Sequence, residues 1–384
     1  MSPMCRALVA GVALSVAAPL AAVAGVLITV HNPSQLSRKC ETVEVRLSDL
    51  LDRDGALGKE SIGVIDQGSK KELVVQVTEA ALLFQSDFAP GETRTFLAAA
   101  GKKKAEGPVS SVDGFFALPR EDYAWENDRV AFRVYGPALA AEVNNGIDVW
   151  TKRVRERIVR KWYEADAASG TGNYYHTDRG EGADFFAVGR TLGAGGSGLW
   201  YKDSLHQPGV FTSHRVVSNG PIRTSFELSY AWNVAGKRFT ETKRIALDAG
   251  RNLNIIEIRF VGLAPEDSPL IACGVVKRKN VTVQVSDDGS RAALWGPTND
   301  DSANGFLGTG IVLDPASVAR RIEDSVHVLL LGRMVEGRPF RYLAGAGWTR
   351  SGDFSDAAAW QTYLKEESLK LDEPLQITFA PDRP

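Results

Sequence analysis

Apolar and polar side chains alternate every second residue in several well-separated segments of this 384-residue chain. Successive side chains of a β-strand point to opposite faces, so each alternating segment predicts a strand with one buried face. Turn-forming sequences at residues 219–221, 248–250 and 287–289 separate such segments. We therefore expect an all-β protein of large antiparallel sheets, arranged as a sandwich or a stack. The alternating apolar positions are Val130, Phe132 and Val134; Phe226, Leu228, Tyr230 and Trp232; Ile256, Ile258 and Phe260; and Leu375, Ile377 and Phe379.

Two segments follow a helical pattern instead. Residues 148–163 place an apolar side chain at every fourth position with Lys and Arg between them, which predicts an amphipathic helix. A second helix is expected to begin near Ser355, because serine is favoured at helix N-caps. Both helices are predicted to pack on the flank of a sheet. Their apolar positions are Trp150, Val154, Ile158 and Trp162 in the first, and Trp360, Tyr363 and Leu364 in the second.

Residues 1–24 have the three parts of a secretory signal peptide. Arg6 supplies the positive start, residues 7–20 are apolar, and Ala22-Val23-Ala24 gives the small-x-small pattern that precedes cleavage. A membrane anchor is the alternative, because apolar residues continue beyond this point. Pro19 and the β-branched run at residues 26–30 favour a signal peptide followed directly by a strand. We expect a secreted or periplasmic protein with no membrane span after cleavage.

The rest of the chain is long enough for two domains. Residues 25–105 contain their own strand candidates, at 43–47, 73–77 and 95–97, and are predicted to form a small N-terminal β-sandwich. The polar residues 101–111 contain Gly and Pro and are typical of a linker. Residues 106–384 are predicted to form the large β-sandwich that carries the functional site.

The composition argues against nucleic acid as a partner and leaves one disulfide bond undecided. A formal net charge of -2 gives no electrostatic footprint for nucleic acid. There are three cysteines, and Cys5 lies within the signal peptide. Cys40 and Cys273 are able to pair in an oxidising compartment, but the sequence does not determine whether they meet.

Residues 193–198 match the glycine pattern GxGxxG of dinucleotide-binding proteins. That site requires the loop to join a strand to a helix, so that the helix N-terminus meets the pyrophosphate. Residues 199–203 show no helical period, so we interpret the glycines as a place where the backbone bends or closely approaches another group.

The densest polar cluster lies at residues 174–184, bracketed by glycines. A loop of this kind supplies a general base, a group that neutralises charge, or metal ligands; the alternative is a polar loop satisfied by itself and by water. Its candidate site residues are Tyr175, His176, Asp178, Arg179, Glu181 and Asp184.

A second cluster begins at Trp125 and leads into the strand at residues 130–135. Carboxylates beside Arg and Trp fit a sugar subsite, and they fit a salt-bridged strand edge equally well. His206 and His214 lie near enough to turns to reach a site, although an isolated histidine is more often structural. Oxygen ligands are available for a divalent cation such as Ca²⁺, without EF-hand spacing; no cofactor is specified. The candidates in this cluster are Trp125, Glu126, Asn127 and Arg133, and the oxygen ligands are on Asn127, Asp128, Asp178 and Asp184.

These segments resemble a family of secreted bacterial proteins catalogued as domain of unknown function 4861. The resemblance is carried by Trp125-Glu126-Asn127-Asp128 with residues 131–137, by residues 146–150, by the segment Tyr175-His176-x-Asp178-x-Gly180-Glu181-Gly182-x-Asp184-Phe185, by the loop at 189–196 and by residues 219–226. It implies a supersandwich like that of polysaccharide lyases and galactose mutarotases. It also implies a place in polysaccharide utilisation and activity on an acidic oligosaccharide or polysaccharide.

The chemistry that the resemblance implies is elimination across C4–C5 of a uronic acid, by a lyase or dehydratase. Such a reaction needs a group that neutralises the substrate carboxylate, a base for the C5 proton and an acid for the leaving group. Arg179 or Arg133 is the candidate neutraliser, His176 the base and Tyr175 the acid, which requires a bent loop at 174–178. Asn127 is expected to bind the carboxylate, and Trp125 or Trp200 to stack on a sugar ring.

Three other functions remain open from the sequence. A carbohydrate-binding protein without catalysis keeps the aromatic residues and does not need His176. A glycoside hydrolase needs two opposed carboxylates, and a mutarotase needs a histidine with a carboxylate. The carboxylates available for such a pair are Glu126, Asp128, Glu181 and Asp184.

Overall fold

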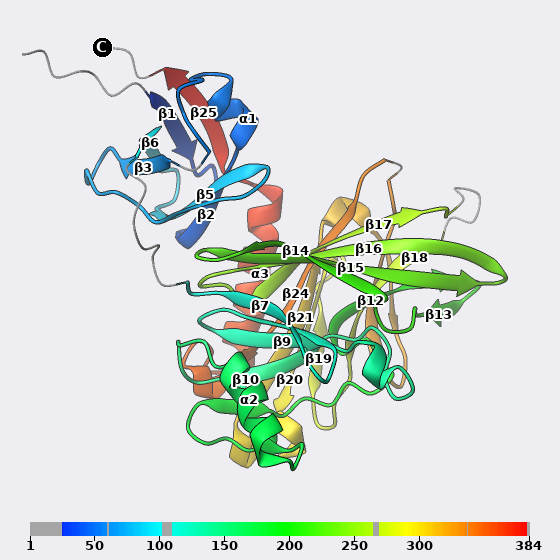
Figure 1. Ribbon diagram of the computed structural model, residues 1–384. Coiled ribbons are helices and arrows are strands. Elements are labelled where there is room, and N and C mark those ends of the chain that lie inside the picture. Colours follow the sequence, from blue (N-terminus) through cyan, green and yellow to red (C-terminus); the bar gives the residue numbers. More distant parts are fainter. Residues whose placement is uncertain (1–24, 60, 102–109, 264–268, 336, 382–384) are drawn as a thin grey trace, which may run out of the picture.

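The computed structural model describes residues 25–59, 61–101, 110–263, 269–335 and 337–381. The predicted signal peptide lies outside these residues. Within them the chain is an all-β sandwich protein of antiparallel sheets with three α-helices, as the alternation predicts (Figure 1). No helix in this part of the chain is both long and apolar enough to cross a membrane.

Two small sheets form the N-terminal region, and they share one apolar core. Val26 and Ile28 from the first sheet and Val43 and Phe84 from the second are all buried in it. The helix α1 (Leu47–Leu51) closes one end of this core. The first sheet has the order β25 (Gln376–Pro381), β1 (Gly25–His31), β6 (Thr93–Ala100) and β3 (Ile62–Asp66); the second has the order β2 (Arg38–Arg46), β5 (Ala81–Phe88) and β4 (Val75–Val77).

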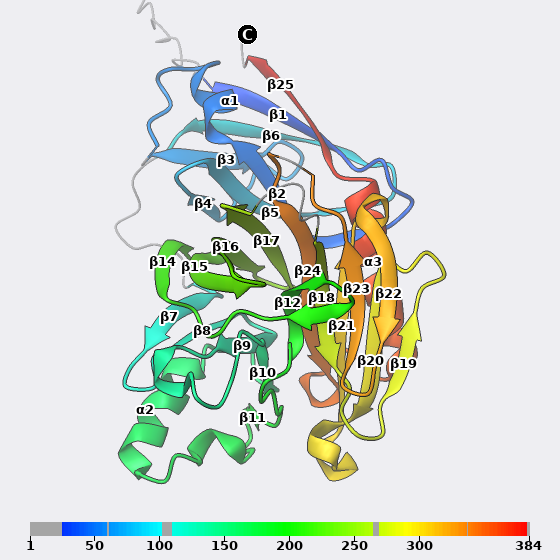
Figure 2. The ribbon, with the colours of Figure 1, turned by 90° about the vertical axis from the view of Figure 1, so that its right-hand side faces the viewer.

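The last strand of the chain returns to the first. β25 pairs antiparallel with β1 from Val26↔Pro381 to His31↔Gln376, and Figure 2 shows it reaching up from helix α3 (Ala357–Asp372) to the N-terminal sheets. The predicted boundary puts all residues after 105 in the larger domain, whereas this pairing puts residues 376–381 in the N-terminal sheet. Ile377 and Phe379 pack against the core of that sheet, which is the reason for their alternating pattern.

Three sheets build the larger part, and an apolar core is shared among them. An eight-stranded sheet faces a five-stranded sheet, and a second five-stranded sheet covers the remaining end of the core (Figure 2). The eight-stranded sheet has the order β14 (Ser213–Asn219), β15 (Arg223–Val234), β16 (Lys237–Asp248), β17 (Leu253–Val261), β24 (Phe340–Trp348), β21 (Phe306–Leu313), β20 (Arg291–Pro297) and β19 (Thr282–Val285). The facing sheet has the order β13 (Ser204–His206), β12 (Ala194–Tyr201), β18 (Leu270–Val276), β23 (His327–Gly332) and β22 (Val318–Glu323).

The remaining sheet is buried on both faces and positions the candidate site. One face packs on the sandwich core, and the other packs on helix α2 (Val159–Ser169) and the short 3-10 helix η2 (Tyr174–His176). Every residue of its three central strands is therefore buried, polar ones included. Its order is β11 (Gly182–Asp184), β10 (Asp148–Lys152), β9 (Val130–Val134), β8 (Asp122–Glu126) and β7 (Asp113–Ala117).

The helix predicted at residues 148–163 is wrong in its first half. Residues 148–152 are strand β10, and α2 begins at Val159. The four-residue spacing arises because Trp150 on the strand and Trp162 on the helix face the same small core. The second predicted helix is confirmed as α3 (Ala357–Asp372), with Asp356 rather than Ser355 as its N-cap, and it covers the outer face of the eight-stranded sheet.

The structure also decides the pairing of Cys40 with Cys273 and the meaning of the GxGxxG segment. Cys40 is exposed, Cys273 is buried, and both are free thiols. The GxGxxG segment leads into strand β12, not a helix, so it lacks the geometry of a dinucleotide site. At Gly193 the φ angle is 62°, and a Cβ atom there would lie 2.2 Å from the Ile147 carbonyl oxygen, so the glycine serves close backbone packing.

We predict that ending the chain at Asp372 destabilises the N-terminal sheets. The truncation removes the apolar contacts of Ile377 and Phe379, and burial of two such side chains is worth about 2–4 kcal/mol. Urea unfolding should report a loss of this size, with reduced hydrogen-exchange protection in β1. A matched variant that ends at Pro381 retains β25 and should unfold like the full chain; equal stability of the two truncations would contradict the account.

Candidate functional site

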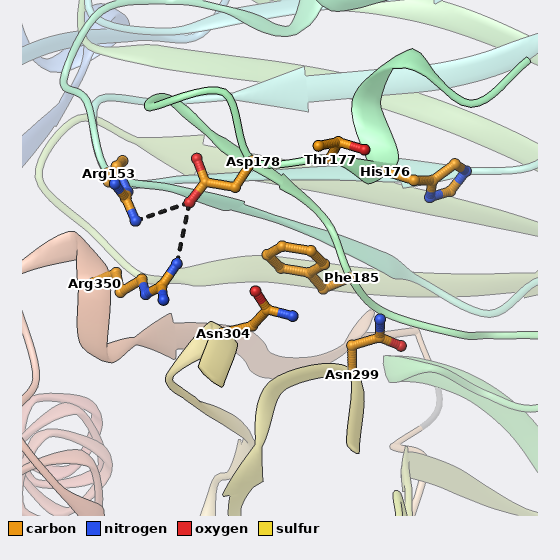
Figure 3. Close-up of a pocket in the computed structure, with 8 residues that line it drawn as sticks. All are labelled: Arg153, His176, Thr177, Asp178, Phe185, Asn299, Asn304 and Arg350. Atoms are coloured by element: carbon orange, nitrogen blue, oxygen red, sulfur yellow. Dashed lines mark hydrogen bonds and ion pairs between the residues drawn. The ribbon is translucent and has the colours of Figure 1, made fainter. Parts of the chain in front are cut away.

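An open cleft of about 530 Å³ lies where the η2–β11 segment meets the loop between β20 and β21. Cationic, amide and aromatic side chains line it, and Figure 3 shows how they converge from four separate stretches of the chain. The lining residues are Arg153, His176, Thr177, Asp178, Phe185, Asn299, Asn304 and Arg350.

His176 reaches the cleft because the chain turns tightly at η2. The turn directs Tyr175 into the protein, where 2 % of it is exposed, and leaves 43 % of the His176 side chain exposed. The bend that the predicted roles of Tyr175 and His176 require is therefore present. His176 Nδ1 lies 3.0 Å from the backbone oxygen of Asp184 and 3.6 Å from its carboxylate Oδ2. A carbonyl oxygen accepts hydrogen bonds, so Nδ1 of the neutral ring carries the proton and Nε2 keeps its lone pair.

Asp178 lies between two arginines on the other side of the cleft. Its Oδ2 is 2.8 Å from Arg153 Nη2 and 3.3 Å from Arg350 Nη1, as the dashed lines in Figure 3 mark. Its Oδ1 accepts hydrogen bonds from the backbone N–H groups of Gly180 and Gly182, which fixes the turn. Two guanidinium groups share one carboxylate, so the cleft keeps a surplus of positive charge.

The loop between β20 and β21 forms the opposite wall. It contains two 3-10 turns, η4 (Thr298–Asp300) and η5 (Ser302–Asn304), which carry Asn299 and Asn304. The Trp348 Nε1 donates to the Asn304 backbone oxygen at 2.9 Å, and Arg350 donates to the Ala303 backbone oxygen. The end of β24 and the turn that follows it at Thr349–Ser351 thereby hold this wall in place. Amide side chains both donate and accept hydrogen bonds, which suits sugar hydroxyls.

A buried charge cluster lies directly behind His176. The Arg133 side chain is 7 % exposed, and its guanidinium contacts Asp148 at 2.7 Å, Asp184 at 2.6 Å and the Tyr175 hydroxyl at 3.2 Å. Asp122 lies 3.6 Å away and accepts a hydrogen bond from Tyr163. We refer to Arg133, Asp122, Asp148 and Asp184 as the Arg133 cluster.

Burial controls the protonation of this cluster. Loss of solvation raises the pKa of Asp122 to about 6 and raises the pKa of Asp148 and of Asp184 above the usual range, against the opposing effect of Arg133. The same desolvation raises the pKa of the Tyr175 hydroxyl. These three carboxyl groups therefore bind a proton more readily than exposed aspartates do.

The second predicted cluster is structural in this fold. Trp125 is fully buried and donates through Nε1 to Asn254 at 2.7 Å, so no ring face is available for a sugar. Asn127 is also buried and bridges backbone groups of the β16–β17 turn. The Glu126 carboxylate accepts from Lys152 Nζ at 2.6 Å and from the first backbone N–H groups of α2, beginning at Ile158. A carboxylate at a helix N-terminus stabilises that helix, which explains why α2 begins there.

Five other candidates lie outside the residues that line the cleft. Arg179 packs on the Tyr174 ring and donates to backbone oxygens, and Glu181 binds Lys161 and Trp162. Trp200 and His206 belong to the sheet edge at β12–β13, and His214 on β14 stacks on Phe116. The predicted site residues that do line the cleft are His176 and Asp178, with Arg133, Tyr175 and Asp184 behind them.

Most residues that line the cleft were not predicted from the sequence. Arg153, Thr177, Asn299, Asn304 and Arg350 also line the cleft. Arg350 lies 172 residues from Asp178 along the chain, so no local pattern connects them. Phe185 lies inside the segment that carries the family resemblance, so its position could have marked it as a candidate site residue. In the part of the chain that the structure describes, no group of three or more His, Cys, Asp or Glu side chains is arranged to hold a metal ion.

Comparisons with other proteins agree with this architecture. Residues 30–377 match the family model described as "Domain of unknown function (DUF4861)". Uncharacterized protein P7 of Formosa agariphila is 33% identical over 378 residues, which cover 92% of this chain and 93% of that protein. Two solved structures from Enterococcus faecalis share the fold: a protein in the glycosyl hydrolase family 38, with a TM-score of 0.51, and an alpha-mannosidase, with a TM-score of 0.50.

Both solved structures are 11% identical to this chain, so the likeness concerns the fold alone. Each alignment covers 94% of this chain. The chain spans about half the length of those proteins, 47% and 46% respectively.

We predict that Glu126→Ala destabilises the protein strongly, because it removes the carboxylate partner of the buried Lys152 ammonium and the acceptor of the first N–H groups of α2, and leaves Lys152 the Asn127 backbone oxygen. Removing one partner of a buried ion pair costs about 3–5 kcal/mol. Chemical unfolding measures this loss directly. Glu181→Ala is the matched control: it loses an ion pair with Lys161, which is 59 % exposed, and a hydrogen bond from Trp162 Nε1; such an ion pair is worth about 1 kcal/mol or less, and such a hydrogen bond about 0.5–1.5 kcal/mol. Similar losses for the two variants would contradict the structural role of Glu126.

Proposed function

The chain belongs to the family of domain of unknown function 4861, and from the geometry of its cleft we propose that it is a carbohydrate-active enzyme acting on uronic-acid-containing oligosaccharides. The reaction that fits best is elimination across C4–C5 of a uronic acid, as in a lyase or dehydratase. One observation carries the proposal: His176, with Nε2 free, shares a cleft with the arginine pair Arg153 and Arg350. A base and a binding site for an anion are therefore available together.

The fold relatives support a carbohydrate as the substrate class. Both solved structures bear names of sugar-processing proteins, a glycosyl hydrolase family 38 protein and an alpha-mannosidase. Amide groups on one wall of the cleft suit sugar hydroxyls, and Phe185, which is 8 % exposed, lies between the walls (Figure 3). The surplus positive charge of the cleft favours an acidic sugar over a neutral one.

The arginine pair takes the role of neutralising the substrate carboxylate. Guanidinium groups bind carboxylates through charge-assisted hydrogen bonds, and neutralisation makes the neighbouring C5 proton more acidic. Arg153 and Arg350 are each about one-third exposed, so a ligand can reach them beside Asp178. The sequence had suggested Arg133 or Arg179 for this role. Arg133 is buried, and Arg179 does not line the cleft.

His176 takes the role of base through Nε2. When His176 removes the C5 proton, the electron pair of the C5–H bond forms the new C4–C5 double bond. The C4–O bond breaks, and the leaving oxygen keeps the electron pair of that bond. Tyr175 is buried and accepts a hydrogen bond from Arg133, so it does not fit the role of acid. The proton held on His176 is then returned to the leaving oxygen, which completes the reaction with no net change in the enzyme.

A hydrolase fits the cleft less well. It requires two carboxylates facing one another across the scissile bond. Of the described residues, Asp178 is the carboxylate that lines the cleft, while Glu126 and Asp184 are buried. Asp178 and His176 together also meet the requirement of a mutarotase, and analysis of the products separates that reaction from elimination.

We expect His176→Ala to lower kcat on a uronic oligosaccharide by about 10²–10⁴-fold, the usual contribution of a general base. The measurement follows the ultraviolet absorbance of the C4–C5 double bond together with reducing ends. His206→Ala is the control, because its ring contacts the Tyr201 backbone oxygen and does not line the cleft. Absence of new absorbance with every acidic glycan tested, despite binding, would refute elimination; new reducing ends without absorbance would indicate hydrolysis.

We expect Arg350→Gln to raise KM by about 10–100-fold, since a hydrogen bond to a charged group contributes about 1.5–3 kcal/mol. The effect should vanish for the methyl ester of the same uronic substrate, which lacks the negative charge. Arg320→Gln, which loses an exposed ion pair with Asp203, is the control. An equal effect of Arg350→Gln on acid and ester would contradict carboxylate recognition.

A further inference from the structure

Arg278 contacts both walls of the cleft without lining it. It follows β18 of the five-stranded sheet that faces the eight-stranded one, and its guanidinium reaches the loop between β20 and β21. Its Cζ atom also lies 5.9 Å from the centre of the Phe186 ring, which is next to Phe185 in the other wall. In the described part of the chain Arg278 forms no ion pair, and its hydrogen bonds go to backbone oxygens.

The guanidinium binds both strands of the β20–β21 hairpin at the base of the loop. Nη1 donates to the Pro297 backbone oxygen at 2.7 Å, and Nη2 donates to the Leu307 backbone oxygen at 2.6 Å. Pro297 is the last residue of β20, and Leu307 is the second residue of β21. A charged donor makes stronger hydrogen bonds than a neutral one, and the planar fork of arginine fixes the positions of its two partners. One side chain therefore holds both ends of the loop.

The loop starts with a turn that places Asn299 in the cleft. Asn299 and Asp300 have φ angles of 51° and 55°, and the Asp301 N–H donates to the Thr298 backbone oxygen at 3.0 Å. Asparagine adopts this left-handed backbone more readily than most non-glycine residues. The Asn299 side chain is exposed and makes no hydrogen bond within the described residues (Figure 3). Its amide is therefore available to a ligand.

The two amides of this wall have separate anchors. Trp348 and Arg350 bind the backbone of η5, which carries Asn304. Arg278 instead holds Pro297, which directly precedes η4. A shift of Pro297 therefore moves the amide of η4, while the amide of η5 keeps its own two contacts.

We propose that Arg278 is a positioning residue, which holds η4 in place so that the Asn299 amide binds a hydroxyl group of the substrate. An amide and a hydroxyl both donate and accept hydrogen bonds, so they match in either direction. This contact recognises the sugar independently of its charge, whereas Arg153 and Arg350 recognise the carboxylate. The part that Asn299 plays in substrate binding rests on the proposed function; the anchoring of the loop by Arg278 does not.

Hydrogen exchange tests the anchoring without any substrate. Arg278→Lys keeps the positive charge and loses the fork that binds two carbonyls. We expect faster exchange of the Asp301 and Gly305 amides, which are hydrogen-bonded within the loop, and unchanged exchange in β16. Unchanged exchange in the loop would overturn the anchoring. Equal acceleration in β16 would overturn it too, because Arg278 would then stabilise the sandwich as a whole.

Kinetics on a uronic oligosaccharide and on its methyl ester separate positioning from charge. Arg278→Lys should raise KM by about 2–10-fold, the worth of one hydrogen bond, for acid and ester alike and with kcat unchanged. An unchanged KM, or an effect on the acid alone, would overturn the role in binding hydroxyl groups.

Asn299→Gly tests the amide itself, because glycine keeps the left-handed turn and removes the side chain. We expect the same rise in KM without loss of stability, and no further rise when Arg278→Lys is added, since both changes act through one amide. Asn280→Gly is the matched control: Asn280 is also exposed, has a φ angle of 57° and does not line the cleft. Equal KM values for the two glycine variants would overturn the role of Asn299 in binding. If no uronic oligosaccharide is turned over, elimination is refuted, and hydrogen exchange still decides the anchoring.

Discussion

The guanidinium of Arg133 connects the elements on which the candidate site depends. It lies on β9 and contacts Asp148 at the start of β10, Asp184 at the end of β11 and Tyr175 in η2. These contacts fix the segment from η2 to β11, and His176 belongs to that segment. The cluster is buried beneath a layer formed by α2 and η2. Water therefore does not screen the attraction between its charges.

Burial of the central strands on both faces explains how such a cluster is tolerated. One face meets the sandwich core and the other meets α2, so the inward carboxylates find hydroxyl, indole and guanidinium donors rather than water. Glu126 completes the arrangement by binding Lys152 and the start of α2. The cluster therefore supports the surface cleft from behind: the strands hold the segments in place, and the loops supply the residues that line the cleft.

The sequence predicted the strands well because alternation follows from burial of one face, as at residues 226–232 of β15. It failed at residues 148–152, since a strand buried on both faces does not alternate. The site was predictable where its residues are local: His176 and Asp178 lie in one glycine-rich segment. Arg153, Asn299 and Arg350 were not, because tertiary packing alone brings their segments together. Trp125 and Asn127 are residue types that bind sugars, but both are buried, so no ligand in the cleft can reach them.

The central claim is that this cleft receives the acidic sugar with its C5 side toward His176. A crystal structure of the full-length His176→Ala protein with an unsaturated or saturated uronic oligosaccharide tests it most directly. We expect the sugar carboxylate within hydrogen-bonding distance of Arg153 or Arg350, and C5 facing position 176. A sugar bound elsewhere, for example between the N-terminal sheets and the larger sandwich, or a carboxylate directed away from both arginines, would contradict the claim.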